Sequence, residues 1–449
     1  MSQAVEKLTQ LVHSNERYHL SHAELRDTQV QAINERFQSR KESIKLLRHR
    51  AEQAGISEVT SLDQTVPLLF PHTVYKSYPE SFLMEEKWDR LSRWLDTVAT
   101  YRVPELDPAP LSGIDAWVEK LKESDHYVSC SSGTTGKSAM LVASGQDMAW
   151  CRQEAVAAYA WGSGVQPARD RRIFGLGAVA LVPRNQATSE AYTEAYQNPQ
   201  IEYFRSSMPP ITVGSLTQMV VLRKKIADGT AKPGELQAFE TLSVERQEAI
   251  NRAVKETAEA IVAARHDKLH MTGLWANLYT LAEAVRKMGY SAKDFHDENS
   301  IYVGGGLKRA ALPSDYREFV YETFNIAPER NYVNYSMQEL HSGMPRCREG
   351  GRYHIPPWVV PLVLDKSGDH LLPIVEEEYE GRAAFFDLSI DGRWGGVISG
   401  DKVSIDFSPC ACGASGPSIR DNIVRYSDLE GDDKIGCAGT VDAYVRGIA

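Results

Sequence analysis

Short strand-like runs alternate with helical patterns across the middle of the chain, and this alternation constrains the fold more than any other feature. The runs lie at 173–176, 269–272, 301–303 and 331–335. Helical patterns separate the later runs, at 278–288, where Gly289 would end the helix, and near 313–325. Strands that are separated by helices pair in parallel. We therefore predict an α/β fold of βαβ units, with ligand-binding loops at the strand ends.

Two stretches do not follow this alternation of strands and helices. A long helical region spans 214–265, interrupted between Gly229 and Gly234, and we expect its apolar face to serve packing. From 355 to 425 short β runs dominate, which predicts a small antiparallel sheet or barrel. Helical patterns also occupy 22–54. We therefore divide the chain into an α/β core at 1–354, a β-rich subdomain at 355–425 and a hinge remnant at 426–449.

Charge and hydropathy exclude several classes of protein. The 449 residues carry a formal net charge of −10 and no dense Lys/Arg tract, which argues against nucleic acid and favours a small metabolite as partner. No apolar run is long enough to span a membrane. The first residues, MSQAVEKLTQ, lack the apolar core of a secretory signal. We therefore expect a cytoplasmic protein, with a homodimer as the default assembly.

A loop rich in hydroxyls and glycine follows the apolar run Tyr127–Cys130. It reads Ser131-Ser132-Gly133-Thr134-Thr135-Gly136-Lys137. A Walker loop needs glycine where this chain has Ser131, so the Walker geometry is excluded. The hydroxyls, unhindered amides and single ammonium still suit a phosphate. A polar turn between a strand and a helix is the structural alternative.

The loop is one of four motifs that follow one another along the chain. They are the loop itself, Gly304-Gly305-Gly306, Tyr335-Ser336-Met337-Gln338-Glu339 and Gly400-Asp401. Together they resemble the adenylate-forming superfamily of acyl-CoA synthetases, adenylation domains of nonribosomal peptide synthetases and luciferases. The resemblance implies the large domain of that fold, with ATP and Mg²⁺ bound at these motifs while a carboxylate attacks the α-phosphorus.

The resemblance also implies a role for each matching residue. Ser131, Lys137 and the residues between them would hold the β- and γ-phosphates, with Lys137 and Glu339 as the catalytic pair and Glu339 as the Mg²⁺ ligand. Asp401 would accept hydrogen bonds from the ribose. Arg425 would contact the ribose too, although Val424 replaces the usual glycine before it. The adenine and acyl groups would lie against Gly304, Gly305, Gly306, Tyr335, Ser336 and Met337.

Finer features resemble particular branches of the superfamily. The loop and Cys410-Ala411-Cys412-Gly413 are similar to phenylacetate-CoA ligases, and Gly304–Lys308 is similar to the acyl-protein synthetase of bacterial luminescence. The chain ends soon after Asp432-Asp433-Lys434, at about the hinge of the family, so we expect the mobile C-terminal lid to be absent. Adenylating proteins of griseoluteic acid (phenazine) biosynthesis are the lid-less members that the chain resembles.

These resemblances imply activation of a carboxylic acid as its adenylate, with an aromatic acid preferred and a fatty acid left open. A reductase or an acyl-acceptor protein would then be the partner. The pocket for the acid would be lined by 174–178, 272–275 and 304–307, and Arg184 or Lys308 would pair with a second polar group. A stand-alone CoA ligase and a binding protein without turnover remain open alternatives.

The six cysteines are too few for a disulfide scaffold, so we expect reduced thiols or a metal site. Cys347, His354, Cys410 and Cys412 would complete a closed tetrahedral site for a structural Zn²⁺, with four unrelated buried residues as the alternative. Cys437 could carry an acyl group as a thioester. We favour the simpler interpretation of Cys437 as a small buried hydrophobic residue.

Overall fold

The computed structural model describes residues 3–106, 111–131, 137–305, 307, 311–373, 378–430 and 435. Contacts divide the chain into two compact units, Met1–Glu154 with Ser336–Ala449, and Ala155–Tyr335. The boundaries predicted from the sequence at 354 and 425 stay a prediction. Several residues singled out in the sequence lie outside the described part, namely Ser132, Gly133, Thr134, Thr135, Gly136, Gly306, Lys308, Asp432, Asp433, Lys434 and Cys437.

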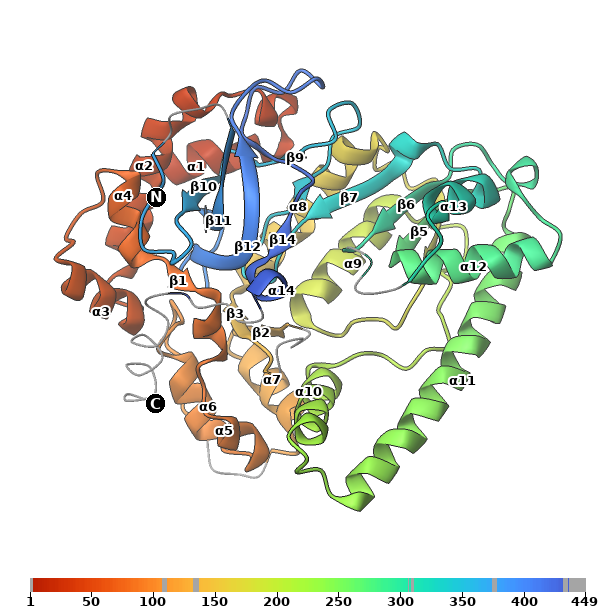
Figure 1. Ribbon diagram of the computed structural model, residues 1–449, viewed down its shortest axis with the longest axis horizontal. Helices are drawn as coiled ribbons and strands as arrows, with labels where there is room; N and C mark the ends of the chain where they lie inside the picture. Colours follow the sequence, from red (N-terminus) through yellow and green to blue (C-terminus); the bar gives the residue numbers. More distant parts are fainter. Residues whose placement is uncertain are drawn as a thin grey trace. The chain divides into compact units, whose positions relative to one another are not determined.

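The second unit contains the predicted parallel strands. They follow chain order in space, as β4 (Arg171–Gly175), β5 (Lys268–Gly273), β6 (Ser300–Val303) and β7 (Asn331–Tyr335). Helices connect them, as predicted, and are α9 (Pro183–Tyr196), α10 (Val213–Ala227), α11 (Pro233–Ala263), α12 (Trp275–Lys287) and α13 (Tyr316–Phe324) (Figure 1). The strand-like runs and helical patterns that alternate in the sequence thus form βαβ units.

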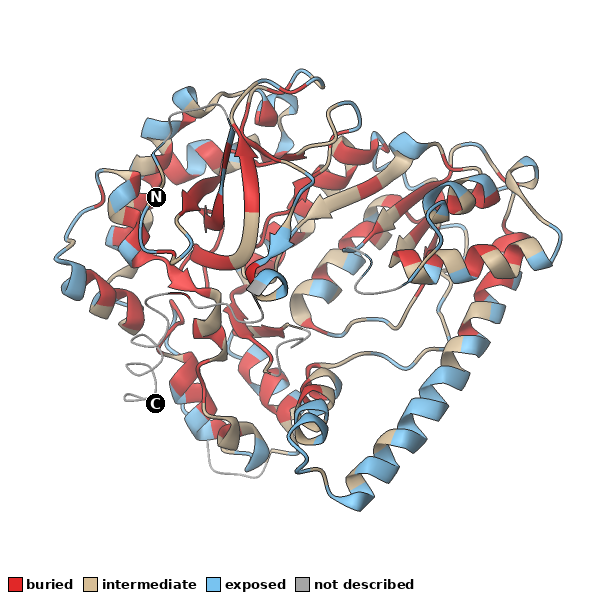
Figure 2. Ribbon diagram, in the orientation of Figure 1, coloured by how far each residue is buried: buried red, intermediate tan, exposed pale blue. Residues whose placement is uncertain are grey.

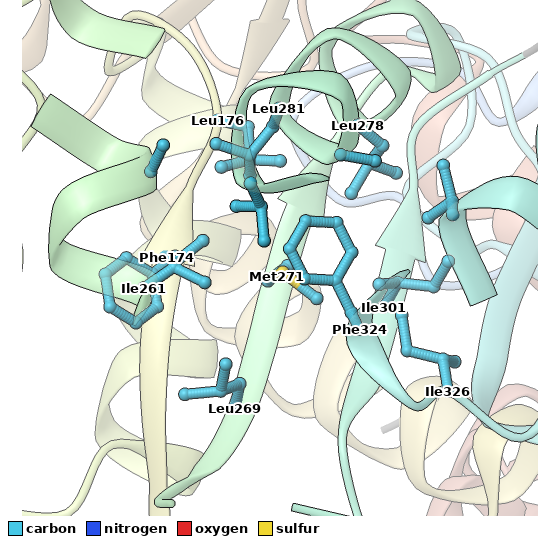
Figure 3. Close-up of a cluster of buried hydrophobic side chains, with 14 of the residues drawn as sticks. Phe174, Leu176, Ile261, Leu269, Met271, Leu278, Leu281, Ile301, Phe324 and Ile326 are labelled. Carbon is cyan, nitrogen blue, oxygen red and sulfur yellow. The ribbon is translucent and has the colours of Figure 1, made fainter. Parts of the chain in front are cut away.

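An apolar cluster joins these strands to their helices. Figure 3 shows Leu269 and Met271 of β5 beside Ile301 of β6, with Leu278 and Leu281 of α12 above them. Met271 pairs with Ile301 across the β5–β6 register. Each such side chain contributes about 1.5–3 kcal/mol when it is fully buried. This cluster therefore fixes the strand ends from which loops can reach a ligand.

The long helical region is an α10–α11 pair, interrupted where the sequence predicts. Gly229 follows α10 with φ of +68°, a conformation that a glycine adopts without strain. The C-terminal end of α11 packs into the unit through buried Thr257 and Ile261, whereas its N-terminal half is exposed along its length (Figure 2). The expectation that this helix serves packing holds for its last turns.

A second buried cluster in the same unit surrounds one histidine. His270 Nδ1 lies 3.0 Å from the Tyr159 hydroxyl and 3.1 Å from Ser300 Oγ. The rings of Tyr159 and Tyr196 lie 4.9 Å and 6.0 Å from the His270 ring. Burial, and next the positive charge of Arg171, lower the pKa of His270 to about 3. His270 is therefore a neutral member of the core.

The first unit is built on an antiparallel sheet, as the β-rich pattern predicts. Its order is β10–β11–β12–β13–β9, and β14 and β1 also pair with β12. The strands are β1 (Phe70–Pro71), β9 (Tyr353–His354), β10 (Val359–Leu364), β11 (Glu378–Asp387), β12 (Gly396–Asp406), β13 (Ser418–Ile419) and β14 (Val424–Arg425). The parallel pairing of β1 with β12 was not predicted, because a two-residue strand has no periodicity to detect.

Helices and one hairpin complete this unit. The hairpin is β2 (Tyr127–Cys130) with β3 (Met140–Ala143), and β8 (Met344–Pro345) is a short strand. The helices are α1 (Gln3–Thr9), α2 (His22–Arg40), α3 (Lys45–Ala54), α4 (Leu62–Thr65), the 3₁₀ turn η4 (His72–Lys76), α5 (Glu80–Met84), α6 (Trp88–Leu95), α7 (Ile114–Lys122), the start of α8 (Gly145–Ser163) and α14 (Tyr426–Glu430). Within the described ranges, no helix has the length and apolar character that a membrane crossing requires.

The neutral His270 predicts a pH dependence of stability. Its pKa in the folded chain, about 3, lies below the 6.5 of an unfolded histidine. Between these values the unfolded state takes up a proton that the folded state resists, so folding loses on the order of 5 kcal/mol as pH falls from 6.5 toward 3. Above pH 6.5 the full contribution is present.

Denaturant unfolding of the native chain and His270→Gln between pH 7.5 and 4 checks this prediction. The difference in unfolding free energy between the two should shrink as pH falls. His266→Gln, at an exposed histidine of the same unit, is the control and should keep the native slope. A constant difference between the native chain and His270→Gln would contradict the prediction.

Candidate functional site

The hydroxyl-rich loop connects the two antiparallel strands of a hairpin rather than a strand and a helix. β2 pairs with β3 from Tyr127 opposite Ala143 to Cys130 opposite Met140. Beyond these strands the Ser131 amide donates to the Ala139 carbonyl at 3.2 Å, and the Ala139 amide donates to Ser131 Oγ at 2.9 Å. Ser131 thus closes the neck of the loop. The apolar run at 127–130 is the strand β2.

Lys137, at the other end of the loop, contacts a tyrosine from a distant part of the chain. Its ammonium donates to the Tyr78 carbonyl and lies 4.3 Å from the centre of the Tyr78 ring. The Tyr78 hydroxyl in turn donates to the Ser138 carbonyl at 2.7 Å. Ser138 Oγ is buried and has no hydrogen-bond partner within the described residues. The loop end therefore carries a cation and an orphaned hydroxyl side by side.

Glu339 lies on a turn in which the Leu340 amide donates to the Met337 carbonyl at 3.3 Å. Its carboxyl is half-buried, and burial is the main cause that raises its pKa. The positive charges of Lys76 and Arg393 oppose that rise, and the negative charge of Asp401 adds to it. Glu339 is thus a carboxylate held among two cations and a second carboxylate.

Asp401 and Arg425 form an ion pair across neighbouring strands. Residue 401 of β12 stands opposite residue 425 of β14, and Arg425 Nε lies 3.6 Å from Asp401 Oδ1. The Asp401 side chain is 15% exposed and that of Arg425 is 58% exposed, so both remain accessible from solvent. The two residues assigned to the ribose are therefore neighbours in the structure.

Sequence reasoning missed the segment that connects these groups. β1 pairs with β12 at Val397 and Ile398, and η4 follows β1 directly. At the end of η4, the pKa of Lys76 is lowered, first by burial, while the charge of Glu339 opposes this and that of Arg425 adds to it. Two residues further on, Tyr78 contacts Lys137. A lysine among aromatic residues in Val74-Tyr75-Lys76-Ser77-Tyr78 was the available signal.

The remaining residues assigned to the nucleotide divide between the units. Ser336 is exposed and Met337 half-buried in the first unit. Gly304, exposed after β6, and Tyr335, at the end of β7, belong to the second unit, where Gly305 has φ of +95°. Their position at the carboxyl ends of parallel strands is where ligands bind in α/β folds.

Three thiols and one imidazole gather at the end of β9, as the cysteine pattern predicts. The candidate ligand atoms of Cys347, His354, Cys410 and Cys412 all lie within 4.8 Å of one another. The Cys347 and Cys410 sulfurs are 3.6 Å apart, too far for a disulfide, and Cys412 Sγ lies 3.4 Å from His354 Nε2. A β-carbon at Gly350 would stand 2.1 Å from Cys410 Sγ, so only glycine permits this approach. The four residues form one cluster rather than unrelated core positions.

Known structures with a similar fold include an open form of 2-hydroxyisobutyryl-CoA ligase in complex with 2-HIB-AMP and CoA. That match has 14% identity and a TM-score of 0.52, and it covers 92% of this chain and 75% of the ligase. A match at this identity shows a shared fold, so the predicted fold class is confirmed.

Two further known structures are less similar to this chain. ATP-bound MatB from Rhodopseudomonas palustris has 13% identity and a TM-score of 0.37, over 72% of this chain and 50% of MatB. The amide bond synthetase Mcba from Marinactinospora thermotolerans has 13% identity and a TM-score of 0.35, over 93% and 78%. No protein-family model and no curated protein matches the sequence.

Proposed function

We propose that this protein uses ATP to activate a carboxylic acid as an acyl adenylate, with release of pyrophosphate. The observation that carries the proposal is the gathering of Glu339, Asp401, Lys76 and Arg425 around β12, next to the segment that contacts Lys137. Attack of a carboxylate on ATP brings anions together, so such a reaction needs cations and accessible donors fixed in advance. This group of residues supplies both.

The proposed step needs no oxidant and no net proton transfer. An oxygen of the acid forms a bond to the α-phosphorus, the bond from that phosphorus to the bridging oxygen breaks, and pyrophosphate leaves with the electron pair. Lys137 would exchange its contacts with Tyr78 for the β- or γ-phosphate. Asp401 would accept hydrogen bonds from the ribose hydroxyls, and Arg425, its ion-pair partner, would hold the carboxylate in place.

Mg²⁺ fits the donor set that this proposal requires. The ion is held in proteins by one or two carboxylates together with substrate phosphates and water. Glu339 offers one carboxylate whose pKa is raised by burial, and a nearby divalent charge would stabilise the ionised form. When bound, the ion would neutralise the triphosphate charge that builds up as pyrophosphate leaves.

A finer proposal concerns the class of acid. We propose an aromatic acid, accepted at the residues after β4, β5 and β6, in the manner of phenylacetate-CoA ligases. Leu176 and Trp275, which follow β4 and β5, are apolar members of the buried cluster in this region. The adenylate would pass to a reductase or another acyl acceptor in the cytoplasm, as in the biosynthesis of an antibiotic such as a phenazine. A complete CoA ligase and a binder without turnover are the competing functions.

Pyrophosphate exchange with a panel of aromatic and fatty acids tests the proposal. We expect acid-dependent incorporation of labelled pyrophosphate into ATP, strongest with an aromatic acid. Addition of CoA separates the competing functions, because a complete ligase would release acyl-CoA. Tight ATP binding without exchange on any acid would contradict an enzymatic role.

Replacement of the proposed Mg²⁺ ligand should lower exchange sharply. Glu339→Gln keeps the size of the side chain and removes the charge, so we expect a loss on the order of 100-fold in the exchange rate. The matched control is Glu380→Gln, at an exposed carboxylate of β11 that pairs with Lys402. Equal rates for the two variants would reject Glu339 as the ligand.

We also propose that Cys347, His354, Cys410 and Cys412 hold a structural Zn²⁺. Zinc bonds of about 2.3 Å to sulfur and 2.0–2.1 Å to nitrogen give tetrahedral edges of about 3.8 Å between sulfurs and about 3.5 Å between sulfur and nitrogen. The observed 3.6 Å and 3.4 Å are close to these values. Burial and the neighbouring sulfurs raise the pKa of the Cys412 thiol, a rise that a bound cation would reverse.

Metal analysis of protein purified without chelator should find one zinc per chain. Cys410→Ser should lose the metal and lower the midpoint of thermal unfolding, because a ligand that ties two chain segments is removed. Cys130→Ser is the control, since this buried thiol lies outside the cluster and its loss should leave the zinc content unchanged. Absence of zinc from the native protein would refute the site.

A further inference from the structure

Arg393 contacts the turn that carries Glu339. Its Nη2 donates to the Glu339 carbonyl at 2.9 Å and lies 3.4 Å from that of Gln338. Its Nη1 donates to the Val142 carbonyl at 2.9 Å and lies 2.9 Å from His341 Nε2. The side chain is 1% exposed. One buried guanidinium therefore connects β3, which follows the hydroxyl-rich loop, to the backbone of the proposed Mg²⁺ ligand.

The hydrogen bonds around His341 define the role of each ring nitrogen. A guanidinium can only donate, so the Nε2 atom that faces Arg393 accepts. Nδ1 then carries the proton that it donates to Asp147 Oδ1 at 3.0 Å. His341 is 2% exposed, so water does not compete for either nitrogen. The His341 ring is hydrogen-bonded to both residues, so the position of Asp147 helps to set the position of Arg393.

Asp147 anchors the other end of this chain of contacts. It lies in the first turn of α8, where its Oδ2 accepts from the Ser144 amide at 2.9 Å. The same carboxylate accepts from the amides of Asp391 and Gly392, each at 2.7 Å. Burial alone would raise the pKa of Asp147, but His341, Arg393 and the Ser144 amide outweigh it and hold the pKa below its usual value. An ionised carboxylate therefore fixes both His341 and the backbone that leads to Arg393.

A second carboxylate holds the same turn from its C-terminal side. Asp387 Oδ2 accepts from the amides of His341 and Ser342 at 2.9 Å and 3.1 Å. Ser342 Oγ accepts from the Trp358 indole at 2.8 Å. Residues 338–342 are thus held at carbonyls, amides and side chains at once. A satisfied network of buried polar groups rigidifies the backbone that it contacts.

We propose that Arg393, oriented by His341 and Asp147, is a positioning residue that sets the Glu339 carboxylate for Mg²⁺ and nucleotide. The inference rests on the function proposed above and adds the residues that orient the Glu339 carboxylate before Mg²⁺ and nucleotide bind. Residues behind a metal ligand orient it, and their loss typically lowers metal affinity 10- to 100-fold. Because Arg393 donates to the main chain of residue 339 itself, its displacement moves the carboxylate without removing it.

A pair of substitutions at position 341 separates positioning from simple packing. The amide of Asn can reproduce the Nδ1 contact to Asp147, whereas the amide oxygen of Gln can reproduce the Nε2 acceptor for Arg393. If the contact to Arg393 matters, His341→Gln retains Mg²⁺ affinity and His341→Asn loses it, although both remove the ring. Equal Mg²⁺ affinity in the two variants would overturn the proposal.

Arg393→Lys, with Arg36→Lys as its control, extends the test. Arg36 also donates twice to a main-chain carbonyl of this unit, that of Leu388 at 3.0 Å and 2.7 Å, and among the described residues it makes no hydrogen bond to 338–342. Calorimetry with α,β-methylene-ATP measures the free Mg²⁺ needed for half-maximal nucleotide affinity. We expect a rise of about 10-fold for Arg393→Lys and none for Arg36→Lys.

The outcomes distinguish the two proposals. Equal Mg²⁺ requirements in Arg393→Lys and Arg36→Lys, with normal nucleotide binding by the native protein, would overturn the positioning role alone. Failure of the native protein to bind the Mg²⁺ nucleotide would overturn the proposed function and this inference together. If Arg393→Lys does not fold, the His341 pair decides, because both of its members keep Arg393.

Discussion

The pairing of β12 with its neighbours is the constraint on which the first unit depends. β12 contacts β11, β13, β14 and β1, so segments from both ends of the sequence share its register. That register sets Asp401 opposite Arg425 and brings η4, which ends at Lys76, beside the same strand. A slip of one residue would turn every side chain of a strand to the other face. The candidate nucleotide site is therefore a consequence of strand pairing.

Buried charge is the second organising feature of this unit. Asp147, Asp387 and Arg393 are each at most 1% exposed, and each makes several hydrogen bonds. Burial of an ionised group costs several kcal/mol unless partners replace its water. Many of the partners are backbone groups, among them the amides of His341, Asp391 and Gly392 and the carbonyls of Val142 and Glu339. The unit thus uses its buried charges to fix irregular backbone where the sheet and helices leave it undefined.

Much of the fold could be predicted because long elements leave periodic signals. The strands β4 to β7, the α10–α11 pair and the β-rich stretch all lie where apolar spacing indicates. Short elements were not predicted: β1 and β14 have two residues each, and no prediction was made for the segment that carries Lys76. At the site, the motifs selected Lys137, Glu339 and Asp401, whereas Lys76, Tyr78 and Arg393 were missed because they match no motif and act through neighbours distant in sequence.

The sequence by itself determined the order of the parallel strands and the longer helices between them, and it selected residue types suited to phosphate, carboxylate and thiol chemistry, because periodicity and local spacing are properties of nearby residues. Tertiary structure alone decided that Cys347 and Cys410 approach to 3.6 Å, that Arg425 pairs with Asp401, and that Arg393 reaches the Glu339 carbonyl. These contacts join residues 24 to 63 positions apart in the chain, and their geometry depends on strand register and on the burial of charge, which no local pattern encodes.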